Sequence, residues 1–249
     1  FSATRRPKDE LDRYLDFTDP DSFPGALSGM HRVFLVRPPA IADVKKQLAP
    51  FISQAKDAGV QHIVFVSLLG VQDRSYLPHY KIEQAIVDSG IPYTFLRPSF
   101  FMQNLTHTHL QEIRQRHELF VPAADGRINF IDCLDIGGVA ARILTEPVGT
   151  YERTWDLTGP ESLSFHDIAS ALSTQLSYEV RYARPGVVRF VWRKLREGTA
   201  LGYALVMAML YVGSRGGAAD KVTDSVQQII ARPPEDIHSF IARHRHLFE

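Results

Sequence analysis

Compact apolar runs separated by amphipathic segments fill the N-terminal part of the chain. Three runs have the composition of parallel strands buried on both faces: His31–Val36, Gln61–Ser67 and Pro92–Pro98. Two segments between them carry apolar residues at helical spacing and end at a glycine, residues 41–58 before Gly59 and residues 82–89 before Gly90. Strands and helices that alternate in this way predict an α/β fold with a doubly wound, mostly parallel sheet.

The pattern changes toward the C-terminus. Asp135 is placed to cap a helix through Leu144, and Thr154–Thr158 has the composition of a late strand. Ser164 and Asp167 have capping-box spacing. The remaining segments are a short strand at 179–182, apolar segments at 187–195 and 201–212, and a final helix at about 236–248. We therefore predict a division into residues 1–159 and a smaller α+β lobe, residues 160–249.

Composition narrows the function classes. The 249 residues include 28 Lys and Arg and 28 Asp and Glu, so no net charge attracts nucleic acid or an anionic membrane, and we expect neither as a partner. The most apolar stretch, residues 204–212, is too short to span a bilayer. The single cysteine, Cys133, excludes an internal disulfide and is typical of the cytoplasm. Histidines spaced two apart, as at His107 and His109, complete no metal site, so we expect no metal.

An ordered set of motifs resembles the NmrA-like branch of the atypical short-chain dehydrogenase/reductases. It covers essentially the whole chain. The motifs are Leu15-Asp-Phe, Gly29-Met-His-Arg-Val-Phe-Leu-Val, Ile63-Val-Phe-Val-Ser-Leu-Leu-Gly-Val, His79-Tyr-Lys-Ile-Glu, Ser89-Gly-Ile-Pro-Tyr-Thr-Phe-Leu-Arg-Pro, Phe100-Phe-Met-Gln-Asn-Leu, Asn129-Phe-Ile-Asp-Cys-Leu-Asp-Ile-Gly-Gly-Val-Ala, Leu157-Thr-Gly-Pro-Glu-Ser-Leu-Ser and Arg232-Pro-Pro-Glu-Asp. The resemblance implies a Rossmann-like NAD(P)-binding domain in residues 1–159 and a substrate or partner lobe in residues 160–249, with 101–128 contributing to the pocket.

The resemblance also implies a feature that the sequence does not contain. Phe1–Arg6 matches the second strand of the family, so a first strand, a glycine-rich turn and the helix that binds the pyrophosphate are expected ahead of Phe1. We expect NADP(H) to be favoured over NAD(H) if that unit is supplied. Without it we expect no dinucleotide binding of useful affinity.

Residues at the carboxyl ends of the strands are the expected cofactor contacts. Arg5 and Arg6 are placed for the 2′-phosphate of NADP, although two solvated arginines would look the same. Two prolines also end a strand without any ligand. The full set that the resemblance implies is Arg5, Arg6, Asp16, Phe17, Val36, Arg37, Pro38, Ser67, His79, Pro98, Ser99 and Phe100.

The catalytic pair of typical short-chain dehydrogenases is missing. Alignment on Glu83 and Gly90 places Ser75 at the tyrosine position and His79 at the lysine position of Tyr-x-x-x-Lys. Some members of the family that reduce quinones carry a histidine here, and a quinone needs little acid catalysis. We expect His79 to lie in the site without being an essential acid. A histidine that only packs at a helix start is the alternative.

Other candidates follow from their positions after strands. Ser67 stands where short-chain dehydrogenases keep a substrate-orienting hydroxyl, but a serine that ends a strand also bonds local backbone. The resemblance places Phe101 and Asn104 in the substrate pocket, and Trp192 suggests an apolar wall or lid in the C-terminal lobe. Aromatic residues at such positions are equally consistent with ordinary core packing.

Two functions remain open from the sequence. The first is an NAD(P)H-dependent oxidoreductase acting on a small apolar acceptor such as a quinone or aromatic dye. The second is a non-catalytic NAD(P)-sensing protein that regulates a protein partner, which the missing catalytic pair favours. A chain that binds no dinucleotide is a third alternative, and an oligomer is compatible with each.

Overall fold

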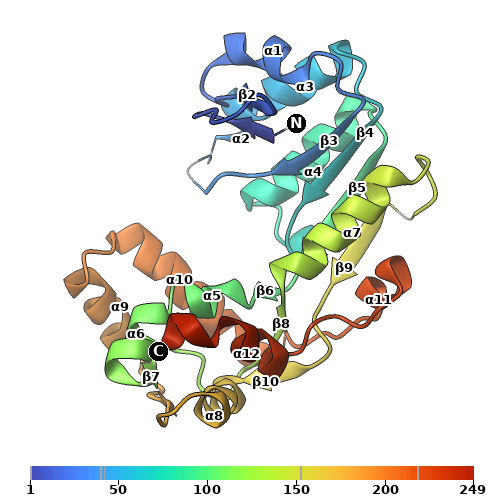
Figure 1. The fold of residues 1–249 in the computed structure, drawn as a ribbon. Helices are drawn as coiled ribbons and strands as arrows, with labels where there is room; N and C mark the ends of the chain where they lie inside the picture. Colours follow the sequence, from blue (N-terminus) through green and yellow to red (C-terminus); the bar gives the residue numbers. More distant parts are fainter. Residues whose placement is uncertain (1, 40, 42, 152, 218) are drawn as a thin grey trace. The chain divides into compact units, whose positions relative to one another are not determined.

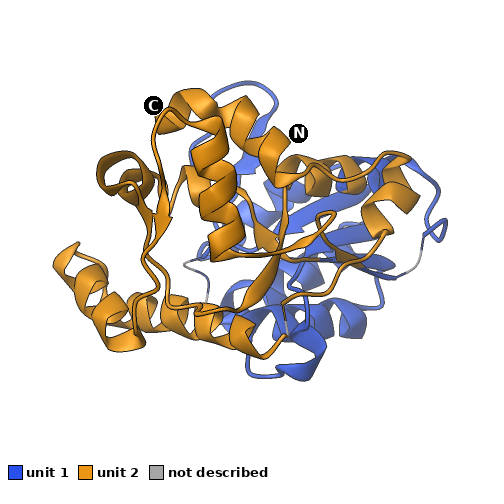
Figure 2. Cartoon of the chain, turned by 90° about the horizontal axis from the view of Figure 1, so that it is seen from below, with its two compact units in different colours: residues 1–97, 140–155 blue, residues 98–139, 156–249 orange. Residues whose placement is uncertain are grey.

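In a computed structural model of the chain, every residue is described except residues 1, 40, 42, 152 and 218. The chain forms two compact units (Figure 2). Unit 1 consists of residues 1–97 and 140–155, and unit 2 of residues 98–139 and 156–249. The division predicted at residue 159 does not coincide with these units, because residues 98–139 pack with the C-terminal part.

A four-stranded sheet forms the centre of unit 1 (Figure 1). Its strands, in spatial order, are β3 (Arg32–Val36), β4 (His62–Val66), β5 (Tyr93–Pro98) and β9 (Thr154–Leu157). The pairs β3–β4 and β4–β5 are parallel, and every residue of β4 is buried. The strands predicted from the apolar runs are confirmed, and with them the α/β fold with a mostly parallel sheet.

Four helices share one buried apolar core with strands of this sheet: α1 (Phe23–Leu27), α2 (Val44–Gln47), α3 (Ala49–Asp57) and α4 (Pro78–Ser89). α7 (Cys133–Thr145) begins in unit 2 and ends in unit 1, and two short 3₁₀ turns are η1 (Pro20–Ser22) and η2 (Val71–Asp73). The segment 41–58, predicted as a single helix, contains two helices. The helical hydrogen bonding is interrupted at Leu48, and Pro50 lies in the first turn of α3, where proline is well tolerated. Gly90 ends α4 in the left-handed conformation, as predicted.

The N-terminal strands form a separate sheet within unit 1. β1 (Ser2–Thr4) pairs in parallel with β2 (Asp12–Tyr14). The strand predicted over Phe1–Arg6 is thus present at its centre, and Phe1 lies outside the described residues. Among the described residues β1 pairs only with β2, and β3 only with β4. The free edge of β3 carries two exposed apolar side chains, Phe34 (43%) and Val36 (52%).

Unit 2 contains two small sheets and a set of helices. One sheet has the order β10-β8-β6, with β6 (Phe100–Phe101), β8 (Arg127–Ile131) and β10 (Ser162–Ser164), and the other pairs β7 (Glu118–Leu119) with β11 (Arg181–Tyr182). The helices are α5 (Gln103–Thr106), α6 (Leu110–Arg116), α8 (Phe165–Gln175), α9 (Val187–Arg196), α10 (Leu201–Gly213), α11 (Ser225–Ile230) and α12 (Ile237–Phe248), with the 3₁₀ turn η3 (Ser214–Gly216). In the part of the chain that is described, no helix has the length and apolarity needed to cross a bilayer.

Helix caps in unit 2 test two sequence predictions. The capping box is confirmed, since Asp167 donates its N–H to Ser164 Oγ (3.2 Å) and accepts from the Ser164 N–H (2.9 Å). The prediction that Asp135 caps α7 is wrong. Asp132 accepts from the N–H of Leu134 (2.8 Å), whereas the buried carboxylate of Asp135 pairs with Arg232 at 2.7 Å.

Candidate functional site

Predicted cofactor residues of unit 1 lie where its parallel strands end. Val36 ends β3 and Arg37 follows it, while Ser67 directly follows β4. His79 occupies the first turn of α4. Because parallel strands end at one edge of the sheet, the carboxyl ends of β3 and β4 form a common edge, which is where open α/β sheets bind ligands.

Ser67 carries an unused hydroxyl at this edge. Its side chain is 1% exposed, and its backbone N–H donates to the carbonyl of Leu96 at 2.7 Å. The buried Oγ makes no hydrogen bond to any described residue. A buried hydroxyl without a partner costs about 1–3 kcal/mol, so this position favours a ligand group that completes the bond.

His79 is held as a neutral imidazole. Its Nε2 accepts a hydrogen bond from Nε of Arg37 at 3.4 Å, and its ring stacks on Phe65 with centroids 6.1 Å apart. Burial, and after it the charge of Arg37, lower the pKa of His79 to about 4. Because Nε2 accepts, the proton of the neutral ring resides on Nδ1. At neutral pH His79 is therefore a weak hydrogen-bond donor and not a strong acid.

The Arg37 guanidinium folds back over the loop that follows β3. Its Nη1 donates to the carbonyls of Pro38 (3.2 Å), Pro39 (3.2 Å) and Ile41 (2.6 Å). Burial lowers its pKa from the usual range. Nη2 makes no hydrogen bond with the described residues and stays open to an anionic or hydroxyl ligand. The two prolines thus belong to a loop that Arg37 fixes, rather than serving only to end β3.

A buried ion pair that the sequence predictions missed supports α4 from the next strand. Glu83, 2% exposed, accepts from Nε of Arg97 at 3.0 Å and from Nη2 at 2.6 Å. Gln72 accepts from Nη1 of the same guanidinium at 3.1 Å. The available signal was a charged residue, Arg97, at the end of an apolar strand. The bidentate pair ties β5 to the helix that carries His79.

Four predicted residues lie after β1 and β2. Arg5 Nη1 is 3.9 Å from Oδ2 of Asp16, whose pKa is lowered mainly by the Thr18 N–H. Phe17 packs edge-on against Phe51 with centroids 5.2 Å apart. Arg6 is exposed, and its guanidinium contacts no described acceptor. The guanidinium of Arg5 therefore already faces a carboxylate, whereas that of Arg6 is available to a ligand.

The remaining predicted residues belong to unit 2. The Ser99 hydroxyl donates to Oδ1 of Asn129 at 2.8 Å, so it is already used inside the unit. Phe100 packs against Phe130 and Tyr211, with centroids 6.3 and 6.1 Å apart. Trp192 is 53% exposed, and the guanidinium of Arg196 lies 3.7 Å from its ring centroid. Pro98 is buried, whereas Phe101 and Asn104 are half-buried.

The hydrogen bonds of Asn129 explain the structural role of the sequence motif that begins with this residue. It is fully buried, and its Nδ2 donates to the carbonyls of Gly159 (3.1 Å) and Glu161 (2.8 Å) while Oδ1 accepts from the Gly159 N–H at 2.7 Å. A Cβ on Gly159 would lie 1.9 Å from the Phe130 carbonyl oxygen, so only glycine fits. Two motifs quoted in the sequence therefore join each other as a structural clamp.

Comparison with known proteins identifies the family. The model of the NmrA-like family matches residues 14–210, which is more than half of the chain. The chain belongs to the NmrA-like family. Arg5 and Arg6 lie before the matched range of this NmrA-like chain, whereas Ser67 and His79 lie inside it.

The relatives of this NmrA-like protein include an azoreductase and a quinone oxidoreductase. The NAD(P)H azoreductase of Xenophilus azovorans is 32% identical over 239 residues, which is 94% of this chain and 82% of the azoreductase. Quinone oxidoreductase 2 of Escherichia coli is 28% identical over 242 residues, 95% of this chain and 82% of that protein.

Solved structures agree with this assignment. An NADPH-dependent quinone oxidoreductase from Escherichia coli superposes with a TM-score of 0.79 at 25% identity, covering 96% of this chain and 83% of the other. The triphenylmethane reductase of Citrobacter sp., complexed with NADP(H), shares the fold with a TM-score of 0.81 at 24% identity, covering 94% and 83%.

Proposed function

We propose that this NmrA-like protein is an NAD(P)H-dependent reductase of small apolar acceptors such as quinones and aromatic dyes. Family membership and the names of its relatives, an azoreductase and a quinone oxidoreductase, support the reaction class. The observation that carries the proposal is the buried, unpartnered hydroxyl of Ser67 at the carboxyl edge of the unit 1 sheet. A ligand at this edge would satisfy it.

The residues at this edge fit a nicotinamide dinucleotide. Such a cofactor supplies the hydride when bound. Ser67 Oγ would hydrogen-bond it, Arg37 Nη2 would face its polar groups, and His79 Nδ1–H would donate to a ribose hydroxyl. Further contacts are proposed at Asp16, Phe17, Val36 and Pro38 in unit 1, and at Pro98, Ser99 and Phe100 in unit 2. Phe101, Asn104 and Trp192 remain the proposed substrate contacts.

The neutral protonation state of His79 favours one class of electron acceptor over another. Reduction of a ketone needs a general acid that protonates the oxygen as hydride arrives, and an imidazole with a pKa of about 4 is unprotonated at neutral pH and serves poorly as one. A quinone or an azo dye accepts hydride readily, and water can supply the proton. We assign His79 a positioning role, which suits an electron-poor acceptor.

With the pyrophosphate-binding unit that the family resemblance implies, NADP(H) is the proposed preference over NAD(H). Arg6 is exposed at the carboxyl end of β1, where a guanidinium pairs with a 2′-phosphate. Arg5 is held 3.9 Å from Asp16, so we assign the contact to Arg6.

An acceptor panel tests the proposed function. NADPH oxidation by the purified protein should be stimulated by quinones and azo dyes, and aliphatic ketones of similar size should give no turnover. Ketone reduction would show that a proton donor has been overlooked. If the protein binds NADPH but reduces none of these acceptors, the NAD(P)-sensing alternative, which the missing Tyr-x-x-x-Lys pair favours, takes its place.

A further inference from the structure

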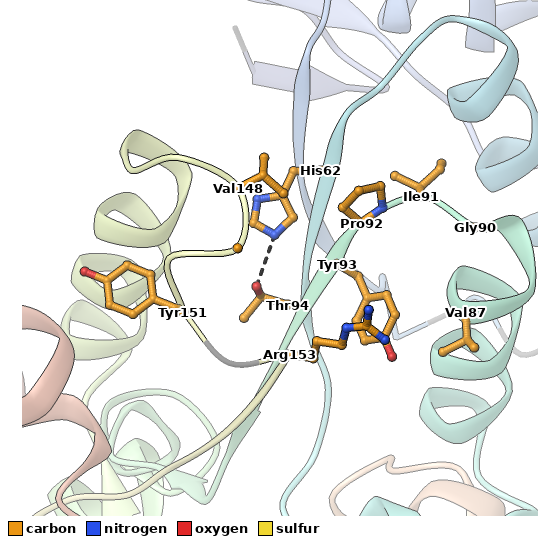
Figure 3. Close-up of a pocket in the computed structure, with 11 residues that line it drawn as sticks. His62, Val87, Gly90, Ile91, Pro92, Tyr93, Thr94, Val148, Tyr151 and Arg153 are labelled. Carbon is orange, nitrogen blue, oxygen red and sulfur yellow. Dashed lines mark hydrogen bonds between the residues drawn. The ribbon is translucent and has the colours of Figure 1, made fainter.

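A cavity lies at the end of the unit 1 sheet opposite to the proposed cofactor residues. It has a volume of about 360 Å³ and is lined by the amino ends of β4 and β5, the end of α4 and the loop between α7 and β9 (Figure 3). His62 and Tyr93 begin their strands here, whereas Ser67 follows the carboxyl end of β4. Because β4 is a single extended strand, this cavity and the proposed cofactor residues lie at its two ends. The volume is within the range of small-molecule sites.

Apolar walls surround one exposed cation in this cavity. The walls include Pro92, Val148 and Val87. The guanidinium of Arg153 lies 5.6 Å from the ring centroid of Tyr93 (Figure 3). The Tyr93 ring in turn stacks on Phe95. No carboxylate of a described residue forms an ion pair with Arg153. The cavity therefore combines apolar walls with a positive charge at its rim that no carboxylate among the described residues pairs with.

Two further cations add to the positive field. Arg32 is the register partner of His62 on the neighbouring strand, and its guanidinium donates to the carbonyls of Leu144 and Glu146. Lys56 Nζ lies 4.0 Å from the position a Cβ on Gly90 would take. Neither forms an ion pair within the described residues, and the nearby carboxylate of Glu146 pairs with Arg142 at 2.8 Å. The surroundings favour an anion.

His62 supplies a second, independent observation. It is 3% exposed, and its Nε2 bonds to Thr94 Oγ1 at 3.1 Å (Figure 3). Its buried Nδ1 has no hydrogen-bond partner among the described residues, although the side chain lines the cavity. Burial, followed by the charge of Arg32, lowers the pKa of His62, so the ring is neutral. A buried polar atom without a partner at a cavity wall points to a ligand group.

We propose that this cavity binds a small apolar carboxylate, with its anionic group on Arg153 and its apolar body against Pro92, Val148 and Val87. Arg153 is the only cation among the described lining residues, so it fixes the position of the charge. The same carboxylate would take up the unpartnered Nδ1 of His62. The site is separate from the cofactor edge, and it stands whether or not the protein is a reductase.

Calorimetric titration with benzoate tests the site, with benzamide as the uncharged match. Benzoate should bind one-to-one in the millimolar range or tighter, as its small size allows. Benzamide should bind about tenfold or more weakly, because it lacks the charge-assisted bond. Absence of benzoate binding, or equal affinity for both compounds, would overturn the proposal.

Two variants distinguish a specific contact between benzoate and Arg153 from a general effect of removing one positive charge. Arg153→Gln should weaken benzoate about tenfold or more. Arg189→Gln is the matched control, because Arg189 is also exposed, is also without a described ion pair and also lies 5.6 Å from a ring centroid, that of Phe120 in unit 2. This control should leave the affinity unchanged. An equal loss in both variants would mean a nonspecific charge effect and would exclude the site.

Val87→Glu provides a test that does not involve Arg153. Val87 is 41% exposed on α4, so the change is compatible with folding, yet it places a negative charge on the cavity wall. Benzoate affinity should fall while NADPH affinity stays the same. Unchanged benzoate affinity in a folded Val87→Glu protein would place the ligand elsewhere.

Discussion

Nε of Arg37 donates a hydrogen bond to Nε2 of His79 across 3.4 Å, joining the end of β3 to the start of α4. The donor fixes which nitrogen of His79 accepts, and burial together with the Arg37 charge keeps the ring neutral. A histidine held in this way can orient a ligand but is a poor proton donor at neutral pH. This pair is the basis for the positioning role that we propose for His79.

The pH dependence of stability should report the neutral His79. Its pKa falls from 6.5 to about 4 on folding, so the unfolded chain binds more protons between these values. The contribution of His79 to the free energy of unfolding is fully present above pH 6.5. It is lost as the pH falls toward 4, and the loss is at most about 3 kcal/mol. Urea unfolding at several pH values should show a smaller loss in His79→Gln than in the natural protein. Equal pH dependence of the two proteins would show that His79 is not held neutral.

The Glu83–Arg97 pair should be a major support of α4. Glu83→Gln removes the buried carboxylate that faces Arg97, and we expect a loss of about 3 kcal/mol in the free energy of unfolding. Glu249→Gln is the control, because Glu249 pairs with Arg245 at the same 2.6 Å but on the surface of α12. The control should lose less than about 0.5 kcal/mol. Similar losses in both variants would contradict the assigned role of burial.

The features that were predicted correctly depend on residues that are close together in the sequence. The capping box at Ser164 and Asp167 and the end of α4 at Gly90 are set within a few positions, and both are confirmed. The break between α2 and α3 also had a local signal, Pro50, that the apolar spacing outweighed.

Interactions between distant residues were not predictable in this way. Asp132 and Asp135 are equally plausible caps from local sequence. Asp132 caps α7 and also pairs with Arg243, whereas Asp135 pairs with Arg232, and both arginines lie far away in the sequence. The contact between Arg37 and His79 likewise joins residues 42 positions apart. Ser67 was placed correctly at the end of a strand, but its lack of a partner depends on the surrounding fold.

Arg6 should control the choice between the two dinucleotides. In the protein that carries the pyrophosphate-binding unit, Arg6→Ala should raise the dissociation constant for NADPH about tenfold or more, because a charge-assisted contact to the 2′-phosphate is lost, and should change that for NADH far less. Arg5→Ala is the neighbouring control, since Arg5 already faces Asp16. Fluorescence titrations of both variants with each dinucleotide measure this. Equal weakening of NADPH and NADH in Arg6→Ala would remove Arg6 from the 2′-phosphate site.

The free edge of β3 should promote association between molecules. Phe34 and Val36 are exposed there, and within the described residues the edge pairs with no other strand. Such an edge can pair with a second molecule. Sedimentation velocity should show concentration-dependent association that Phe34→Lys reduces and Phe34→Tyr does not. A protein that stays monomeric at every concentration would contradict this expectation.

The rate of NADPH-dependent quinone reduction by His79→Gln, with NADPH affinity measured on the same protein, tests the central claim most directly. The account predicts that this variant binds NADPH more weakly but keeps turnover within about tenfold of the natural protein once the cofactor is saturating, because His79 positions and does not protonate. Turnover lost by a thousandfold or more, with NADPH affinity unchanged, would make His79 an essential acid and would contradict the account.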